Sequence, residues 1–177
     1  SDLILDFGHT EGYKKTSETK RPGSKSHFFS QFTKNFKGKN DSDNNIKLLV
    51  QNVSQDKYLK LYKIKSNLVN YDTNALENSF DFTHESENLF FGLKASAYES
   101  LTNVSDDKYE YILPELVLNR NLMSNNKFGI LDLQSNLKVR SYETNKQTTF
   151  LVNDFDWLFK NFIFDSGIKF SLLANIK

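Results

Sequence analysis

Apolar and polar residues alternate along much of the chain with a period of two, which is typical of β-strands whose two faces meet different surroundings. The clearest runs are residues 78–84 and 89–97. The polar segment between them, residues 85–88, has the length and polarity of a hairpin loop. We therefore predict that the two runs form a β-hairpin with one apolar face.

Further stretches share this pattern. Residues 46–51, 131–140 and 162–172 alternate in the same way, and the last two are long enough to cross a bilayer, for which a strand needs about 9–11 residues. Helical spacing is hinted at only in residues 58–64 and 151–162, which are rich in residues that favour strands, so no helix is predicted. Loops are predicted in the polar stretches 37–45, 70–78, 101–107, 119–127 and 143–149. The fold class is all-β, an antiparallel up-and-down meander of roughly eight to ten strands.

The alternation assigns candidate side chains to two faces. The apolar candidates are Phe80, Phe82, Leu89, Phe91, Leu93, Leu131, Leu133, Leu137 and Val139. The polar candidates are Lys94, Asp132, Gln134, Lys138, Arg140 and Lys169. Pro114 has no backbone N–H, so a strand through it needs an edge, a bulge or a local break. It is either a tolerated bulge or a weakened point in a barrel wall.

Composition narrows the classes of protein. Hydrophobic residues make up 38% of the 177 residues and aromatic residues 14%, and cysteine is absent. Disulfides, thiolate metal sites and cysteine nucleophiles are therefore excluded. No apolar run approaches the roughly 18 residues of a membrane helix, and the net charge of +1 gives no reason to expect a nucleic-acid partner. The start lacks Met and an export signal, and the end stops in mid-pattern, so we expect residues 1–177 to be one partial domain of a longer protein.

Candidate chemistry is sparse. A basic segment with Lys14, Lys15, Lys20, Arg21 and Lys25 could bind phosphate groups, but nearby glutamates make a solvated loop the simpler interpretation. The three histidines lack metal-ligand spacing, and no glycine-rich phosphate loop is present. Asp154 and Asp156 could be a glycosidase pair, yet they alternate with aromatic residues as polar-face residues would. We therefore predict no catalytic residues, no metal and no cofactor.

Four segments, in this order, carry a resemblance to a known family. They are 6–13 (DFGHTEGY), 23–30 (GSKSHFFS), 56–62 (DKYLKLY) and 109–115 (YEYILPE). The chain resembles the outer-membrane barrel of the lipopolysaccharide-assembly LptD family, most closely its alphaproteobacterial, Asn- and Lys-rich versions. The resemblance covers most of the chain.

The resemblance implies a Gram-negative outer-membrane transporter with a large transmembrane barrel of about 26 strands. Such a barrel receives lipopolysaccharide from periplasmic bridge proteins through a separate domain, holds an LptE-like lipoprotein plug, and releases its cargo to the outer leaflet through a lateral opening. The present chain would be an interior block of strands. Neither the periplasmic domain nor the closing seam can be placed in it, and the family's cysteines are missing. The apolar candidates would then face lipid, and the polar candidates would line the lumen, where Lys94, Lys138, Arg140 and Lys169 could contact headgroup phosphates.

Two other classes of protein fit parts of the pattern. A soluble all-β carbohydrate-binding or ligand-binding module would need two sheets whose apolar faces meet. A hydrolase would need a cleft of convergent titratable groups. Strand length favours the barrel, because ordinary strands have about 5–6 residues.

Overall fold

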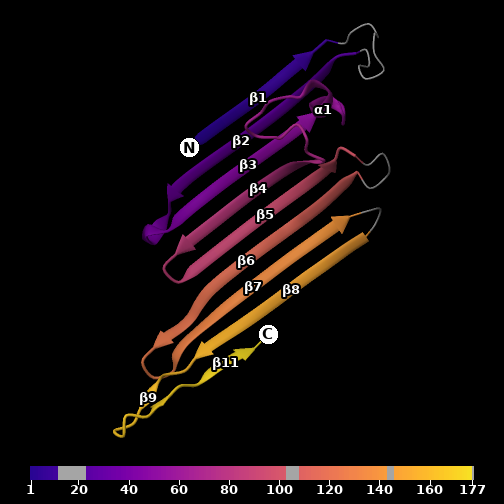
Figure 1. Cartoon of the computed structure of the whole chain (residues 1–177). Helices are drawn as coiled ribbons and strands as arrows, with labels where there is room; N and C mark the ends of the chain where they lie inside the picture. The colour runs from indigo at the N-terminus through magenta and orange to yellow at the C-terminus, as the bar shows by residue number, and fades with distance from the viewer. Residues whose placement is uncertain (12–22, 103–107, 143–145, 177) are drawn as a thin grey trace.

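The computed structural model describes residues 1–11, 23–102, 108–142 and 146–176. Nine strands form one antiparallel sheet with the order β1-β2-β3-β4-β5-β6-β7-β8-β11 (Figure 1). These strands are β1 (Asp2–Thr10), β2 (Lys25–Lys37), β3 (Asp43–Val53), β4 (Ala75–Ser86), β5 (Leu89–Ser100), β6 (Tyr109–Asn125), β7 (Gly129–Tyr142), β8 (Lys146–Leu158) and β11 (Leu173–Ile176). In the described ranges β1 and β11 lie at opposite edges and are not paired, so the sheet is open.

The predicted all-β meander is confirmed, because each strand from β1 to β8 pairs with its neighbours in the chain. The predicted hairpin is β4 and β5, and the runs 46–51 and 131–140 lie within β3 and β7. Strands β1 to β8 have 9 to 17 residues each. All eight reach the length of about 9–11 residues that a membrane-crossing strand needs.

The prediction of a single strand over residues 162–172 is wrong. Two short strands, β9 (Phe162–Ile163) and β10 (Lys169–Phe170), form a separate hairpin instead. Gly167 has a φ of +81°, and its N–H donates to the carbonyl oxygen of Phe164 at 2.8 Å. A glycine adopts this left-handed conformation at little cost, so the polar residues 165–167 turn the chain back on itself.

The predicted loop at 119–127 is shorter than expected. Strand β6 continues to Asn125, and the turn comprises residues 126–128. The Oδ1 atom of Asn125 accepts hydrogen bonds from the N–H groups of Lys127 and Phe128 at 3.0 and 2.7 Å. Strand β8 likewise begins at Lys146, inside the predicted loop 143–149, whose residues 143–145 lie outside the described ranges. Polar composition misled the prediction because polar side chains also occupy one face of these strands.

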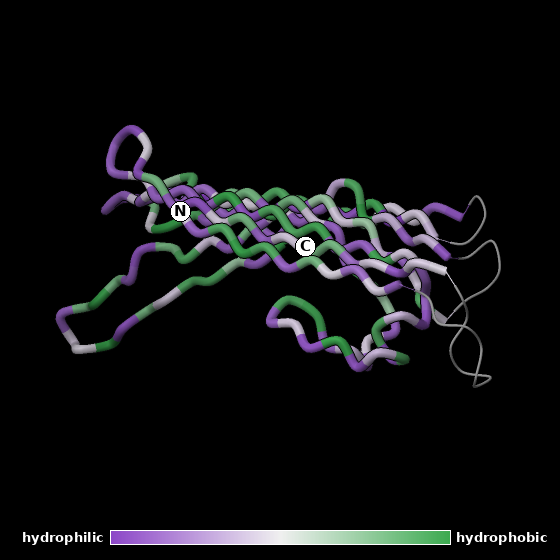
Figure 2. Tube along the Cα trace, turned by 90° about the horizontal axis from the view of Figure 1, so that it is seen from above, coloured by the Kyte–Doolittle hydropathy of each residue, from purple (hydrophilic) through white to green (hydrophobic). Residues whose placement is uncertain are grey.

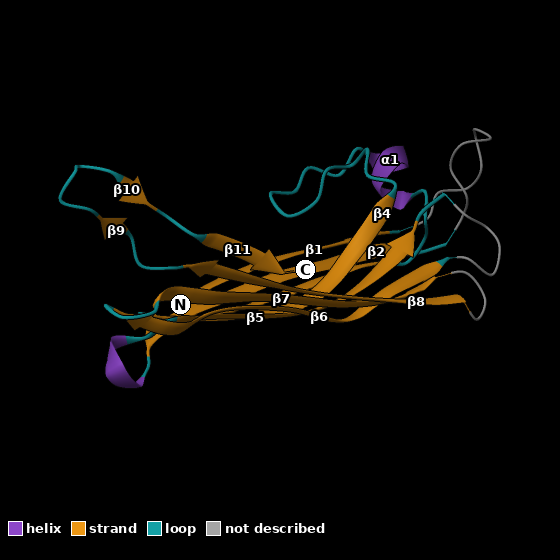
Figure 3. Ribbon diagram, turned by 90° about the horizontal axis from the view of Figure 1, so that it is seen from below, coloured by secondary structure: helices purple, strands orange, loops and turns teal. Residues whose placement is uncertain are grey.

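A short helix that the sequence did not predict lies between β3 and β4. Helix α1 (Tyr58–Tyr62) belongs to the connection 54–74, which folds back over one side of the sheet (Figures 2 and 3). The hairpin β9–β10 projects from the same side, at the other end of the strands (Figure 3). The helix packs into an apolar cluster formed by Phe29, Val53, Tyr58, Leu59, Val69, Leu76 and Leu101. We call residues 54–74 the inner segment.

Candidate functional site: a sheet with two chemically different faces

The register places all nine apolar candidates on one face of the sheet. Phe82 pairs with Leu93, Leu93 with Leu116, and Leu116 with Leu137, which makes one row of this face apolar across four strands. The same face carries Phe80, Leu89, Phe91, Leu131, Leu133 and Val139. We call it the apolar face and its opposite the polar face.

Within the described residues no second sheet packs on the apolar face. Leu5, Leu48 and Leu151 lie near the middle of their strands on this face, yet they are 54%, 43% and 59% exposed. A soluble sheet normally covers such a face with a second layer. The described residues therefore leave this apolar face uncovered.

Aromatic side chains lie at both ends of the apolar face. Tyr109 and Tyr111 are at the start of β6, and Phe155 and Trp157 are at the end of β8, near the opposite end of the sheet. The indole N–H of Trp157 donates to the carbonyl oxygen of Phe128 at 2.8 Å. Rings with an apolar body and a polar group are characteristic of the two interfaces of a membrane.

A few polar side chains also lie on the apolar face, mostly toward strand ends. Arg120 pairs with Leu89, the first residue of β5. Lys34, near the end of β2, holds its ammonium 5.9 Å from the centre of the Phe36 ring. Long basic side chains can bury their stems while their charges reach water, so these two cations are compatible with an apolar surface.

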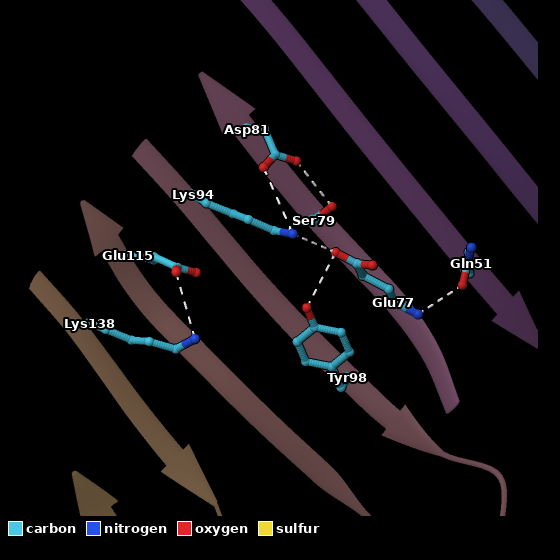
Figure 4. A network of polar contacts seen from close by, with 8 residues as sticks. All are labelled: Gln51, Glu77, Ser79, Asp81, Lys94, Tyr98, Glu115 and Lys138. Carbon is cyan, nitrogen blue, oxygen red and sulfur yellow. Dashed lines mark hydrogen bonds and ion pairs between the residues drawn. The ribbon is translucent and has the colours of Figure 1, made fainter. Parts of the chain in front are cut away.

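On the polar face, a row of charges alternates in sign across five strands. Lys47 pairs with Asp81, Asp81 with Lys94, Lys94 with Glu115, and Glu115 with Lys138. We call these five residues the charge row; part of it is seen in Figure 4. The Lys94 ammonium lies 4.0 Å from Asp81, and Lys138 lies 3.7 Å from Glu115.

The charge row is reinforced by side chains beside it. The Lys94 ammonium is 3.0 Å from Glu77, whose carboxylate also accepts a hydrogen bond from the Tyr98 hydroxyl at 3.4 Å (Figure 4). The backbone N–H of Glu77 donates to the side-chain oxygen of Gln51 at 2.8 Å. These contacts join β3, β4 and β5 on the polar face.

The remaining polar candidates divide into two groups. Arg140 forms two hydrogen bonds to the Glu110 carboxylate, at 2.6 and 2.9 Å, and Asp132 accepts one from the Asn121 amide at 2.8 Å. Gln134 lies exposed on the same face. Lys169, in contrast, lies in β10 and not in the main sheet, because of the turn at 165–167. Since Lys94, Lys138 and Arg140 all have carboxylate partners, these cations are largely neutralised.

The other sequence candidates are not gathered into a site. Lys25 is buried, with its ammonium donating to the carbonyl oxygen of Gly23 at 3.1 Å, whereas Lys14, Lys15, Lys20 and Arg21 lie outside the described residues. Asp154 and Asp156 lie on the polar face, opposite Gln134 and Asp132. The expectation of a solvated loop is therefore wrong at Lys25, which is buried at the start of β2, and the alternative of phosphate binding finds no exposed charge there.

Pro114 lies in a bulge, which is one of the three arrangements that its missing N–H allows. Glu115 pairs with Lys94 on one side and Lys138 on the other, and the next paired residue of β6 is Ile112. The register thus shifts on both sides of Pro114 while the polar charge row continues past it. The bulge lies in an interior strand of the sheet.

The inner segment is attached to the polar face at a histidine. His27 is buried, with Nε2 lying 3.2 Å from the Asp6 carboxylate and Nδ1 lying 3.2 Å from the Tyr58 hydroxyl. If Nε2–H donates to Asp6, Nδ1 accepts from the tyrosine hydroxyl. The His27 ring also stacks on Phe29, with ring centroids 4.8 Å apart. Gly8 pairs with His27, and a Cβ on Gly8 would lie 2.5 Å from the ring.

Two further polar contacts hold the inner segment in place. The side-chain amide of Gln51 donates to the carbonyl oxygen of Leu68 at 3.2 Å. The Lys108 ammonium lies 2.8 Å from Glu99 and 3.0 Å from Asp56. Hydrogen bonds to Glu99 and then to Asp56 raise the pKa of Lys108, although partial burial opposes this rise. The inner segment is therefore held by an apolar cluster and by several hydrogen bonds.

Sequence reasoning missed the inner segment, although two signals point to it. Residues 54–74 are too many for an ordinary hairpin loop of two to five residues. Phe29 is apolar at a position whose alternation assigns it to the polar face. The second signal is weak, because Phe150 also lies on the polar face and is 58% exposed.

The chain matches no protein-family model, no curated protein and no solved structure. Across the described ranges, no helix combines the length and the hydropathy needed to span a membrane. Nor do three or more His, Asp or Glu side chains gather there in a way that could hold a metal ion.

Proposed function

We propose that the chain is part of the wall of an outer-membrane β-barrel that inserts lipopolysaccharide into the outer leaflet. The observation that carries the proposal is the pair of unlike faces on a single sheet of long strands. Lipid tails would cover the apolar face, and a water-filled lumen would solvate the charge row.

Strand length and aromatic placement support the same environment. Strands β1 to β8 meet the length requirement for crossing a bilayer, and aromatic rings lie at both ends of the apolar face. A soluble sandwich would need a second sheet against Leu48 and Phe80, and the described residues place all the long strands in one sheet. The barrel wall is therefore the better proposal.

The choice of lipopolysaccharide is supported by the resemblance of four segments to the LptD family. It also fits the chemistry of an amphiphilic cargo, because a polar interior suits the charged headgroup while the acyl chains need the membrane. On this proposal the partners are lipopolysaccharide, an LptE-like plug and periplasmic bridge proteins that act through another domain.

Site-specific labelling tests the barrel wall directly, and the absence of cysteine makes it free of background. Single cysteines at Phe82 and Leu137, on the apolar face, would carry an environment-sensitive fluorophore in vesicles of brominated phosphatidylcholine. Their neighbours Thr83 and Asn136, on the polar face, serve as matched controls. We expect strong quenching at Phe82 and Leu137 and weak quenching at the controls. Equal quenching on both faces would refute the wall.

The cargo is tested separately, in cells that make the protein. Depletion of the protein should reduce lipopolysaccharide at the cell surface and leave it accumulated inside the outer membrane. If labelling supports the barrel wall but surface lipopolysaccharide is unchanged, the chain is part of a barrel wall and lipopolysaccharide is not its cargo.

A further inference from the structure

The inner segment covers part of the polar face, which makes its outward surface part of the proposed lumen. Tyr58 and Leu59 are each 1% exposed, and they pack against Phe29 and Val53 from the polar side of β2 and β3. Together with the bonds to His27 and Gln51, this packing fixes one surface of the segment and leaves the other open.

The open surface is basic. The inner segment contains four lysines, Lys57, Lys60, Lys63 and Lys65, and two acidic residues near its ends, Asp56 and Asp72. All four lysines are exposed. Lys60 donates to the side-chain oxygen of Asn74 at 2.7 Å, while no salt bridge between described residues involves the other three. Asp56, at the start of the segment, is already paired with Lys108.

This basic surface differs from the strands beneath it. On the polar face, Lys94, Lys138 and Arg140 are each paired with a carboxylate and so attract an anion weakly. Among the described residues no ion pair involves Lys57, Lys63 or Lys65, and an excess of positive charge raises the local concentration of anions. An anion moving along this side of the sheet would therefore bind preferentially at the inner segment.

An open depression lies beside Lys65. It is lined by the consecutive residues 64–71 and has a volume of about 510 Å³. Its polar lining includes Lys65, Asn67, Asn70 and Tyr71, together with Ser66, whose hydroxyl is hydrogen-bonded to the Asp6 carboxylate. An ammonium group beside amide and hydroxyl groups suits a phosphate attached to a sugar, because the amides and hydroxyls can bond the sugar hydroxyls.

We propose that the inner segment is a binding element for sugar phosphates, with Lys57, Lys63 and Lys65 attracting the phosphate and the depression at 64–71 holding the sugar. This inference deepens the proposed function and rests on it for the source of the ligand, a phosphorylated glycolipid headgroup. The site itself depends only on the charges and the depression.

The test measures binding of N-acetylglucosamine 1-phosphate to the whole protein in detergent micelles by NMR titration. N-acetylglucosamine and inorganic pyrophosphate serve as comparison ligands. The variant K57Q/K63Q/K65Q removes three exposed charges and should weaken binding of the sugar phosphate about tenfold. The control K39Q/K127Q/K160Q removes three exposed lysines at the opposite end of the strands and should change it less than about twofold.

Each other outcome overturns a stated part of the proposal. Equal weakening by both triple variants would show a general charge effect and remove the site. If N-acetylglucosamine binds as tightly as N-acetylglucosamine 1-phosphate, the lysines do not contribute to binding. If pyrophosphate binds more tightly than N-acetylglucosamine 1-phosphate, the depression does not hold the sugar. None of these results depends on the lipid quenching at Phe82 and Leu137, so failure of this site and failure of the barrel wall are distinguishable.

Discussion

Replacing Leu48 by arginine tests what covers the apolar face. Leu48 lies at the middle of β3, an interior strand, and it pairs with Phe32 and Phe80 on that face. Leu49, the next residue, points to the polar face between Gln31 and Ser79. The variants Leu48→Arg and Leu49→Arg therefore make the same chemical change on opposite faces of one strand.

The two environments predict different losses at Leu48. An arginine near the bilayer midplane destabilises a barrel by about 2–4 kcal/mol. In water the same change would cost only about 1 kcal/mol, because Leu48 is already 43% exposed and an arginine stem keeps some of its contacts. Leu49→Arg should cost less than about 1 kcal/mol in either case, since the polar face solvates its charge.

The measurement is the free energy of unfolding of the protein refolded into phosphatidylcholine vesicles, obtained from urea titrations followed by circular dichroism. We expect Leu48→Arg to lose at least about 2 kcal/mol more than Leu49→Arg. Equal losses in the two variants, or a loss at Leu48 of no more than about 1 kcal/mol, would refute a lipid-covered face.

Three further predictions concern the inner segment and its attachment. Gly8→Ala should cost about 1–3 kcal/mol, because its Cβ would meet the fixed His27 ring, whereas Gly92→Ala, where the nearest atom is 3.6 Å away, should be nearly neutral in the same urea titration. Leu59→Ala should cost about 2–5 kcal/mol and make residues 54–74 the first site of limited proteolysis; an unchanged cleavage pattern would contradict the packing. The raised pKa of Lys108 means that its stabilisation is complete below the ordinary lysine pKa and is lost only as pH rises through the higher folded value. Stability of the parent relative to Lys108→Met should therefore stay constant near neutral pH and decrease in strong alkali.

Much of the sheet could be predicted because alternation records the two faces residue by residue. Phe80, Phe82, Leu93 and Leu137 share a face in the structure as their spacing indicated. Which residues lie opposite each other could not be predicted, since pairing depends on turn lengths and bulges. For this reason the alternation assigns Lys94 and Asp81 to the polar side, but it does not identify Glu77, Asp81 and Glu115 as the partners of Lys94.

The inner segment was harder to predict because its stability is tertiary. Five residues of helix are too few to form alone, so α1 depends on the contacts of Tyr58 and Leu59 with the sheet. Those contacts join residues distant in the chain, such as Phe29 and Val69. The weak helical spacing in residues 58–64 coincides with α1, but it does not show which residues of the sheet the helix contacts.

The charge row across β3 to β7 also limits how neighbouring strands can slide. A slip by one residue would move every apolar side chain of a strand to the polar face, so the apolar pattern already disfavours it. A slip by two would keep the greasy sides together, yet it would set Lys94 against neutral Ser79 or Thr83 in place of Asp81. The alternating charges therefore disfavour a two-residue slip, which the apolar pattern alone does not disfavour. They act in the middle of the strands, away from the hairpin turns.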